Sequence, residues 1–162
     1  RTLERYGYAV TTVETGEAAV ALVRDDRDID LVLMDIDLGN GMDGTEAAAR
    51  LLAVRELPVV FLTGHAEREM VDRVKGITRY GYVLKTAGEF VLIQAIEMAF
   101  ELFASRQEAV AAAERYRSVT NLTGEITVQH DAEGHWTFLN DRACEFWGAT
   151  REELLTLLDA VK

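Results

Sequence analysis

Three side chains that could together handle a phosphoryl group each follow a short apolar run. Asp35 follows LVLM, Thr63 follows VVFL and Lys85 follows YVL. A carboxylate can attack phosphorus as a nucleophile, and an ammonium group and a hydroxyl can stabilise the charge on the transferred oxygens. Any one of the three is more often a turn residue, a helix cap or a solvated charge. Their joint occurrence after consecutive apolar runs is what indicates phosphoryl transfer to Asp35.

The apolar runs predict the strands that must bring these side chains together. Each run is continuous rather than alternating, which is typical of strands buried on both faces of a parallel sheet. An earlier stretch that starts at Tyr8, YAVTTVE, is a fourth strand candidate. In a doubly wound sheet the carboxyl ends of the strands line one crevice. We therefore expect Asp35, Thr63 and Lys85 to converge there.

Helical patterns separate the predicted strands. Thr15 can cap a helix over Glu17–Val23, and D-G-T-E from Asp43 is typical of a capping box that opens the helix EAAARLLAVR. AEREMVDRVKG predicts a further helix that ends at Gly76, and T-A-G-E from Thr86 predicts another capping box. This alternation of strands and helices predicts an α/β fold with a doubly wound parallel sheet.

The last of these helices is unusually long. From Ala87 to about Ser118 there is no Pro, and Gly88 is the only Gly. Strong helix formers dominate its second half, whereas a flexible linker would carry Gly, Ser and Pro. Apolar residues recur along it at coiled-coil spacing, namely Ile96, Ala99, Phe103, Val110 and Ala113. We expect this seam, weakened by Arg106, to pair with a second copy as a parallel homodimer; a single exposed Ala-rich helix is the alternative.

The pattern changes after Asn121, which indicates a second domain. GEITVQHDAEGHWTFLN predicts two strands around a D-A-E-G turn, and DRACEFWGATREELLTLL is helical with T-R-E-E as a capping box. We expect Trp136, Phe138 and Trp147 to be core residues rather than cofactor contacts. The histidines of this part have no partners at metal-ligand spacing, so we expect neither a metal nor a haem here.

The blocks DLVLMDIDL, LPVVFLTG and YGYVLKT resemble the core of response-regulator receiver domains, in order and spacing. The resemblance implies a flavodoxin-like fold in which Asp35 is the phosphoacceptor and Lys85 bonds the phosphoryl group. It further implies that Thr63 is the switch hydroxyl and Tyr82 the aromatic ring that moves with it. Mg²⁺ would be held by Asp35 and the backbone carbonyl of Asp37.

The resemblance covers roughly residues 1–104, and M-D-G, ending at Gly44, matches the family's loop before the third helix. Two departures stand out. Receivers carry an acidic pair after their first strand, and this strand lies between the second and third strands of the sheet. This chain starts inside the helix that follows that strand. We therefore expect an incomplete metal site and a strand near Tyr8 that lacks its neighbour. Thr86 also replaces the Pro that usually follows the lysine, which implies altered loop geometry without loss of function.

The segment AERYRSVTNLTGEITVQHDAEGHWTFLNDRACEFWGATREELL resembles the start of a PAS domain, with Asn140 and Ala143 in the N-x-x-A position. The resemblances together imply three parts. They are a receiver domain over 1–104 that lacks its first strand, a helical linker over 105–120, and the N-terminal part of an α+β PAS domain over 121–162.

The function that these resemblances imply is a phosphorelay switch. A histidine kinase or phosphotransfer protein would phosphorylate Asp35, and the long helix would carry the change to the PAS domain and an output, for which we favour a sensor histidine kinase. The alternatives are output through a cyclic-dinucleotide enzyme, or a pseudo-receiver that binds proteins without phosphorylation. A small flavodoxin-like enzyme is disfavoured, because the sequence has no Gly-rich phosphate loop.

Net charge and hydropathy limit the classes of partner and the cell compartment that the sequence favours. The formal net charge of −11 disfavours nucleic acid and anionic membranes, which would be repelled. No apolar run approaches the roughly 20 residues that span a bilayer, and no signal peptide is visible. We therefore expect a cytoplasmic protein, cut from a longer chain because it opens on Arg1 and closes without a tail.

Overall fold

The computed structural model describes residues 2–39, 41–64 and 80–159. The chain divides into two compact units, Arg1–Arg106 and Gln107–Lys162. The helix α5 (Glu89–Leu122) contributes its first part to one unit and its second part to the other. Among the described residues, no helix is both long and apolar enough to cross a membrane.

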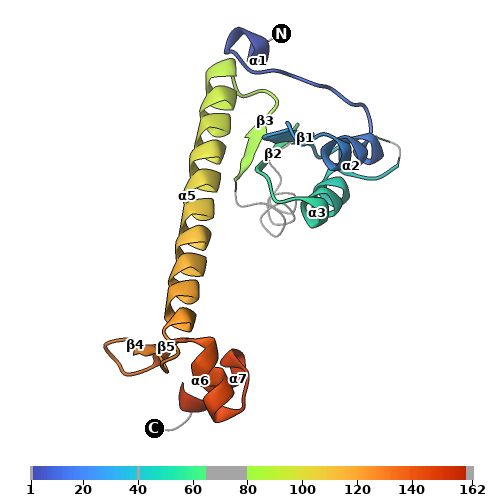
Figure 1. The fold of residues 1–162 in the computed structure, drawn as a ribbon. Helices are drawn as coiled ribbons and strands as arrows, with labels where there is room; N and C mark the ends of the chain where they lie inside the picture. Colours follow the sequence, from blue (N-terminus) through green and yellow to red (C-terminus); the bar gives the residue numbers. More distant parts are fainter. Residues whose placement is uncertain (1, 40, 65–79, 160–162) are drawn as a thin grey trace. The chain divides into compact units, whose positions relative to one another are not determined.

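The first unit is built on a parallel sheet of three strands, β1 (Val32–Asp35), β2 (Val59–Thr63) and β3 (Tyr82–Leu84). The strands lie in the order β1-β2-β3, and Asp35 pairs with Leu62 while Thr63 pairs with Leu84 (Figure 1). The three apolar runs are therefore confirmed as parallel strands.

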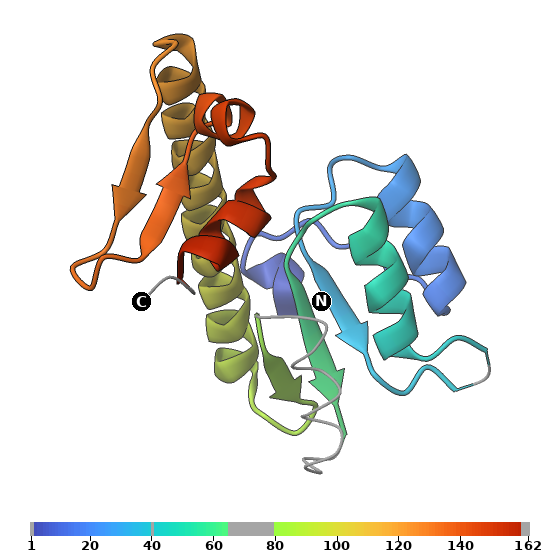
Figure 2. The same cartoon turned by 90° about the horizontal axis from the view of Figure 1, so that it is seen from below.

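Helices cover both faces of this sheet (Figure 2). α2 (Gly16–Asp25) and α3 (Gly44–Val54) pack on one face, where Leu51, Phe61 and Met34 belong to one buried cluster. The first part of α5 packs on the other face, where Ala99 joins the cluster around Val60 and Val83. Burying the sheet from both sides explains why the strands read as continuous apolar runs.

The N-terminal caps of α2 and α3 follow the sequence predictions. The Thr15 hydroxyl accepts a hydrogen bond from Ala18 N at 3.2 Å, and Asp43 Oδ1 accepts one from Glu46 N at 2.9 Å. Each bond satisfies one of the backbone N–H groups that a helix leaves unpaired in its first turn. The last turns of a helix predicted at the start of the chain are present as α1 (Thr2–Arg5).

Two expectations for local structure were wrong. The stretch Tyr8–Val13 forms no strand; β1 pairs with β2 alone, and no described strand lies beside the stretch to complete a ladder. The predicted capping box at Thr86 does not open α5, which begins at Glu89 with Leu92 N bonded to Gly88 O. The predicted helix that ends at Gly76 lies outside the described residues.

The seam expected along α5 is also wrong in its first part. Ile96 and Ala99 are only 2 % and 0 % exposed, because they face the sheet of their own unit. The ring of Phe103 lies edge-on to Tyr80 with the ring centroids 6.0 Å apart. These residues pack within the unit, so a partner chain cannot pair with them.

The second unit contains an antiparallel pair, β4 (Val128–His130) and β5 (Trp136–Leu139), followed by α6 (Asp141–Trp147) and α7 (Arg151–Asp159). The D-A-E-G turn joins the strands as predicted, with Asp131 N bonded to His135 O. Trp136 packs against the core around Leu139 as expected. Trp147 is 42 % exposed, so it is not the core residue that we expected.

Candidate functional site

The carboxyl edge of the three-stranded sheet brings Asp35 and Lys85 together. Asp35 ends β1, and Lys85 directly follows β3, so each lies where its strand leaves the sheet. Leu62, the partner of Asp35, pairs in turn with Val83, two residues before Lys85. Since side chains alternate along a strand, Asp35 and Lys85 lie on the same face. Lys85 Nζ donates to Asp35 Oδ2 at 2.5 Å.

The other carboxylate oxygen of Asp35 is held by its own loop. Asp37 N donates to Asp35 Oδ1 at 3.1 Å, and Gly39 N donates to Asp37 Oδ1 at 3.3 Å. Asp35 nevertheless keeps 31 % of its side-chain surface exposed, and Lys85 keeps 45 %. The carboxylate is thus oriented from both sides while it stays accessible to a reactant.

Thr63 and Tyr82 occupy the opposite face of the sheet from Asp35. Tyr82 pairs with Phe61, and Thr63 lies two residues beyond Phe61 on the same strand. Thr63 is buried, whereas Tyr82 is 42 % exposed. The backbone carbonyl of Thr63 accepts a hydrogen bond from Lys85 N at 2.8 Å. A backbone hydrogen bond therefore joins Thr63, which carries the predicted switch hydroxyl, to Lys85, whose side chain contacts Asp35.

Gly44 brings the start of α3 against the strand end that carries Asp35. Gly44 N donates to Ile36 O at 3.0 Å, and a Cβ atom at Gly44 would lie 1.9 Å from Asp35 O. Only a residue without a side chain fits this approach. The M-D-G motif signalled the loop in the sequence, but it could not show that the glycine is required by contact with Asp35.

A further residue of this loop was missed by sequence reasoning. Glu17 Oε1, in the first turn of α2, accepts a hydrogen bond from Met42 N at 3.4 Å. The two residues are 25 positions apart, and nothing in the local pattern around either one indicates the contact. Glu17 therefore supports the loop that leads from Asp35 to α3.

Residues 1–97 match the response regulator receiver domain family. The chain belongs to the response regulator receiver family. Among curated receiver proteins, the transcriptional regulatory protein PdtaR of Mycobacterium tuberculosis is 32 % identical over 97 residues, which are 60 % of this chain and 40 % of PdtaR. The chain thus matches well under half of the length of this relative.

Two solved receiver structures are similar to this chain over 65 % of its length. The N-terminal domain of a response regulator/sensory box/GGDEF 3-domain protein from Carboxydothermus hydrogenoformans is 48 % identical, with a TM-score of 0.60 and 84 % of that chain covered. The receiver domain of a modulated diguanylate cyclase from Desulfovibrio desulfuricans G20 is 37 % identical, with a TM-score of 0.59 and 83 % of that chain covered. The flavodoxin-like receiver fold is therefore confirmed.

Receiver domains typically bind Mg²⁺ at the phosphorylation site, so the donors around Asp35 are compared with what this ion needs. Within the ranges that the structure describes, no group of three or more His, Cys, Asp or Glu side chains could hold a metal ion. Asp35 provides one partly exposed carboxylate, and Asp37 lies two residues later in the loop that follows β1. Magnesium usually binds one or two carboxylates and completes its shell with water and phosphate oxygens. The one carboxylate of Asp35 therefore meets only part of this requirement, and the described residues show no complete metal site.

Proposed function

We propose that this receiver domain accepts a phosphoryl group on Asp35. A carboxylate oxygen of Asp35 attacks the phosphorus, and the bond from phosphorus to the donor's leaving group breaks. The donor is a phosphohistidine of a histidine kinase or phosphotransfer protein, whose imidazole leaves and takes up a proton. The single observation that carries this proposal is the hydrogen bond between Lys85 Nζ and Asp35 Oδ2.

The residues around Asp35 would take separate roles in this transfer. Lys85 would move its hydrogen bond from the carboxylate to a phosphoryl oxygen and offset the added negative charge. Thr63 lies on the opposite face from Asp35 but at the same edge of the sheet. Its hydroxyl would have to turn over this edge to bond a second phosphoryl oxygen, and Tyr82, on the same face of the sheet as Thr63, would follow its movement. Asp35 and the carbonyl of Asp37 would hold Mg²⁺, which supplies positive charge to the phosphoryl oxygens.

The alternative, a pseudo-receiver that only binds partners, is less well supported. A binding module has no need of a lysine that contacts the aspartate at the strand end. The two readings differ in one measurement. The complete protein and its Asp35→Asn variant are incubated with acetyl phosphate and Mg²⁺ and weighed intact. We expect one added phosphoryl group on the wild type and none on the variant; equal labelling of the two would overturn the assignment.

For the second unit, we propose the N-terminal part of a PAS domain, with 1–104 as receiver, 105–120 as linker and 121–162 as the PAS part. The hairpin, the Asn140 cap and the two helices support this division. The Carboxydothermus protein is described as having a sensory box after its response regulator. That order corresponds to the one proposed here.

For the output, the similar structures favour the cyclic-dinucleotide alternative over a histidine kinase. The Desulfovibrio receiver belongs to a modulated diguanylate cyclase. We therefore propose a diguanylate cyclase downstream, in a protein that pairs through α5. The complete protein should convert GTP to a cyclic dinucleotide. Transfer of phosphate from ATP to one of its own histidines, without cyclic-dinucleotide synthesis, would instead support the histidine kinase.

A further inference from the structure

The first turn of α2 packs against the loop that joins β1 to α3, whose described residues are 36–39 and 41–43. A Cβ atom at Gly16, the first residue of α2, would lie 3.4 Å from a side-chain atom of Leu38 and 3.4 Å from one of Met42. Met42 is only 8 % exposed, and both loop side chains pack in the buried cluster between α2, α3 and the sheet. The apolar side of the loop is therefore fixed against this turn of α2.

Glu17 makes the polar part of the same contact. Its Oε1 accepts a hydrogen bond from Met42 N at 3.4 Å. Its two carboxylate oxygens lie 3.5 and 3.9 Å from the position that a Cβ atom at Gly41 would take, so the carboxylate lies beside two successive loop residues. An acidic residue in the first turn of a helix is favoured by the helix dipole alone. The contact with a second segment is what indicates a further role for Glu17.

The other end of this loop orients Asp35. Asp37 N donates to Asp35 Oδ1 at 3.1 Å, and Asp37 Oδ1 accepts from Gly39 N at 3.3 Å. The same short loop therefore contacts the predicted phosphoacceptor near its start and Glu17 near its end. Movement of the loop at Met42 would pass along the backbone to Asp37 and change the orientation of the Asp35 carboxylate.

We infer that Glu17 is a positioning residue for the phosphorylation of Asp35. This inference rests on the phosphoryl transfer proposed above and adds to it a residue of α2. Glu17 acts through the loop and not on the phosphoryl group. By holding Met42 N it limits the movement of the loop, and the loop keeps Asp37 N on Asp35 Oδ1. The attacking carboxylate is thus oriented before a donor arrives, and orientation of this kind lowers the barrier to a transfer step.

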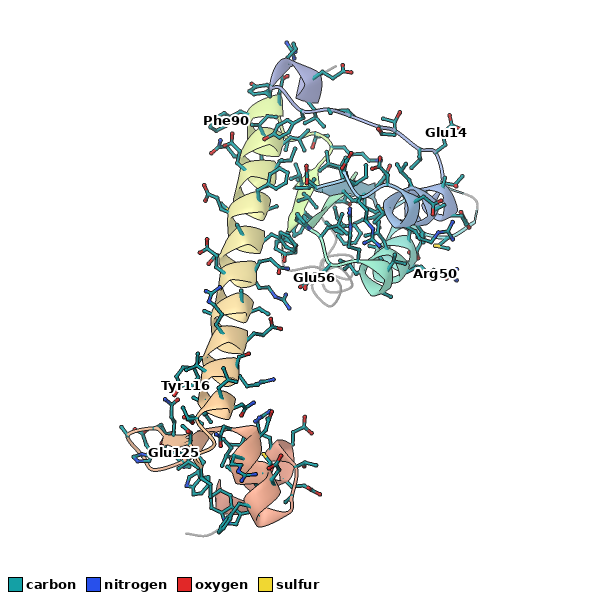
Figure 3. The ribbon with its side chains drawn as sticks, in the orientation of Figure 1. Glu14, Arg50, Glu56, Phe90, Tyr116 and Glu125 are labelled. Carbon is teal, nitrogen blue, oxygen red and sulfur yellow. The ribbon has the colours of Figure 1, made fainter. Side chains whose placement is uncertain are left out.

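Three variants of the complete protein test this role. Glu17→Ala removes the hydrogen-bond acceptor and should slow the labelling of Asp35 by acetyl phosphate roughly threefold to tenfold, as expected for the loss of one hydrogen bond. Glu17→Gln removes the charge but keeps a side-chain carbonyl as acceptor, so it should restore most of the rate. Glu14→Ala is the matched control, because Glu14 is exposed and points away from α2 and α3 (Figure 3); it should label at the wild-type rate.

Two further measurements separate positioning from a general loss of structure. The Met42 amide should exchange its hydrogen faster in Glu17→Ala and slowly again in Glu17→Gln, while the amide of Leu51, inside α3, keeps its wild-type exchange in both. Labelling with phosphoramidate in place of acetyl phosphate should be slowed by the same factor in Glu17→Ala. A residue that orients the carboxylate affects the attack on either donor, whichever leaving group the donor carries.

The outcomes distinguish this inference from the proposed function. A wild-type protein that is labelled on Asp35, with Glu17→Ala labelled equally fast, overturns the positioning role and leaves the phosphorylation of Asp35 standing. A slow Glu17→Ala that Glu17→Gln does not restore also overturns it, since the hydrogen bond to the loop would not be the cause. A wild-type protein that takes no phosphoryl group on Asp35 from either donor overturns the proposed function and the positioning role together.

Discussion

Lys85 Nζ lies 2.5 Å from Asp35 Oδ2, although the two residues are 50 positions apart in the sequence. The parallel register places both on one face, and the carboxyl edge of the sheet brings their ends together. The cation is thus already in place at the carboxylate before any phosphoryl group arrives. Such preorganisation stabilises charge in a transition state without the cost of moving a group to it.

The first prediction follows from this contact. Lys85→Gln should slow the labelling of Asp35 by acetyl phosphate at least tenfold, because a charged donor to the transferred oxygens is lost. Lys85→Arg keeps the charge but not the compact geometry, and should retain part of the rate. The measurement is the time course of phosphorylated mass. Equal rates for wild type and Lys85→Gln would show that the lysine does not act on the transfer.

The second prediction concerns Gly44. Gly44→Ala should destabilise the first unit by about 1–3 kcal/mol, which is typical of overpacking, since the added Cβ would lie 1.9 Å from Asp35 O. It should also slow phosphorylation, because the loop and the strand end must separate. Gly64→Ala is the matched control, since no atom of the described residues lies within 4 Å of the position that its Cβ would take. Thermal unfolding of both variants measures the difference in their stability. Equal stability of the two variants would mean that the loop moves away from Asp35 without cost.

The features that could be predicted from the sequence are those with a local signal. The positions of Asp35, Thr63 and Lys85 at the ends of their strands could be predicted because continuous apolar runs define the strands, and ligands bind at the carboxyl ends of such strands; their roles stay predictions. The caps at Thr15 and Asp43 were likewise local signals. The stretch from Tyr8 was misjudged because a strand needs a neighbour, which β-branched composition does not supply. The side of α5 that faces the sheet was misjudged for a similar reason, since both of its sides carry apolar residues.

The third prediction concerns the pH dependence of the second unit. Backbone and side-chain hydrogen bonds from Thr150 lower the pKa of Glu153 from its ordinary value of 4.5; Glu153 Oε2 accepts from Thr150 N at 2.8 Å and from Thr150 Oγ1 at 2.7 Å. A lowered folded-state pKa means that the ionised carboxylate stabilises the start of α7. This contribution is present above the unfolded value and is lost as pH falls through the folded pKa.

Carbon-detected NMR titration of the Glu153 carboxyl group checks this sign. The midpoint should lie below 4.5 in the wild type and rise in Thr150→Val, which removes the hydroxyl donor and keeps the backbone donor. Glu153→Gln should remove this part of the pH dependence of unfolding. A Glu153 midpoint that does not move in Thr150→Val would mean that the hydroxyl does not contribute.

The fourth prediction concerns Asn140, a buried polar side chain that connects three segments of the second unit. Its Oδ1 accepts hydrogen bonds from Thr127 N and Ala143 N, both at 3.0 Å. Its Nδ2 donates to Thr120 O at 2.9 Å and to Glu125 O at 2.7 Å. The side chain is 0 % exposed and so has no water to replace these partners. It therefore ties the end of α5, the following loop and the start of α6 to one another.

Asn140→Ala should destabilise the second unit by roughly 2–4 kcal/mol, because a helix cap is lost and buried backbone groups are left unsatisfied. Asn140→Ser keeps a cap for α6 but not the two donors, and should recover about 1 kcal/mol of that loss. Hydrogen exchange of the Thr127 and Ala143 amides is the measurement, because it reports on this unit alone. We expect both amides to exchange faster in Asn140→Ala, with Ala143 protected again in Asn140→Ser. Unchanged exchange at Thr127 would mean that the loop is held in place without Asn140, and that α5 is coupled to the hairpin by other contacts.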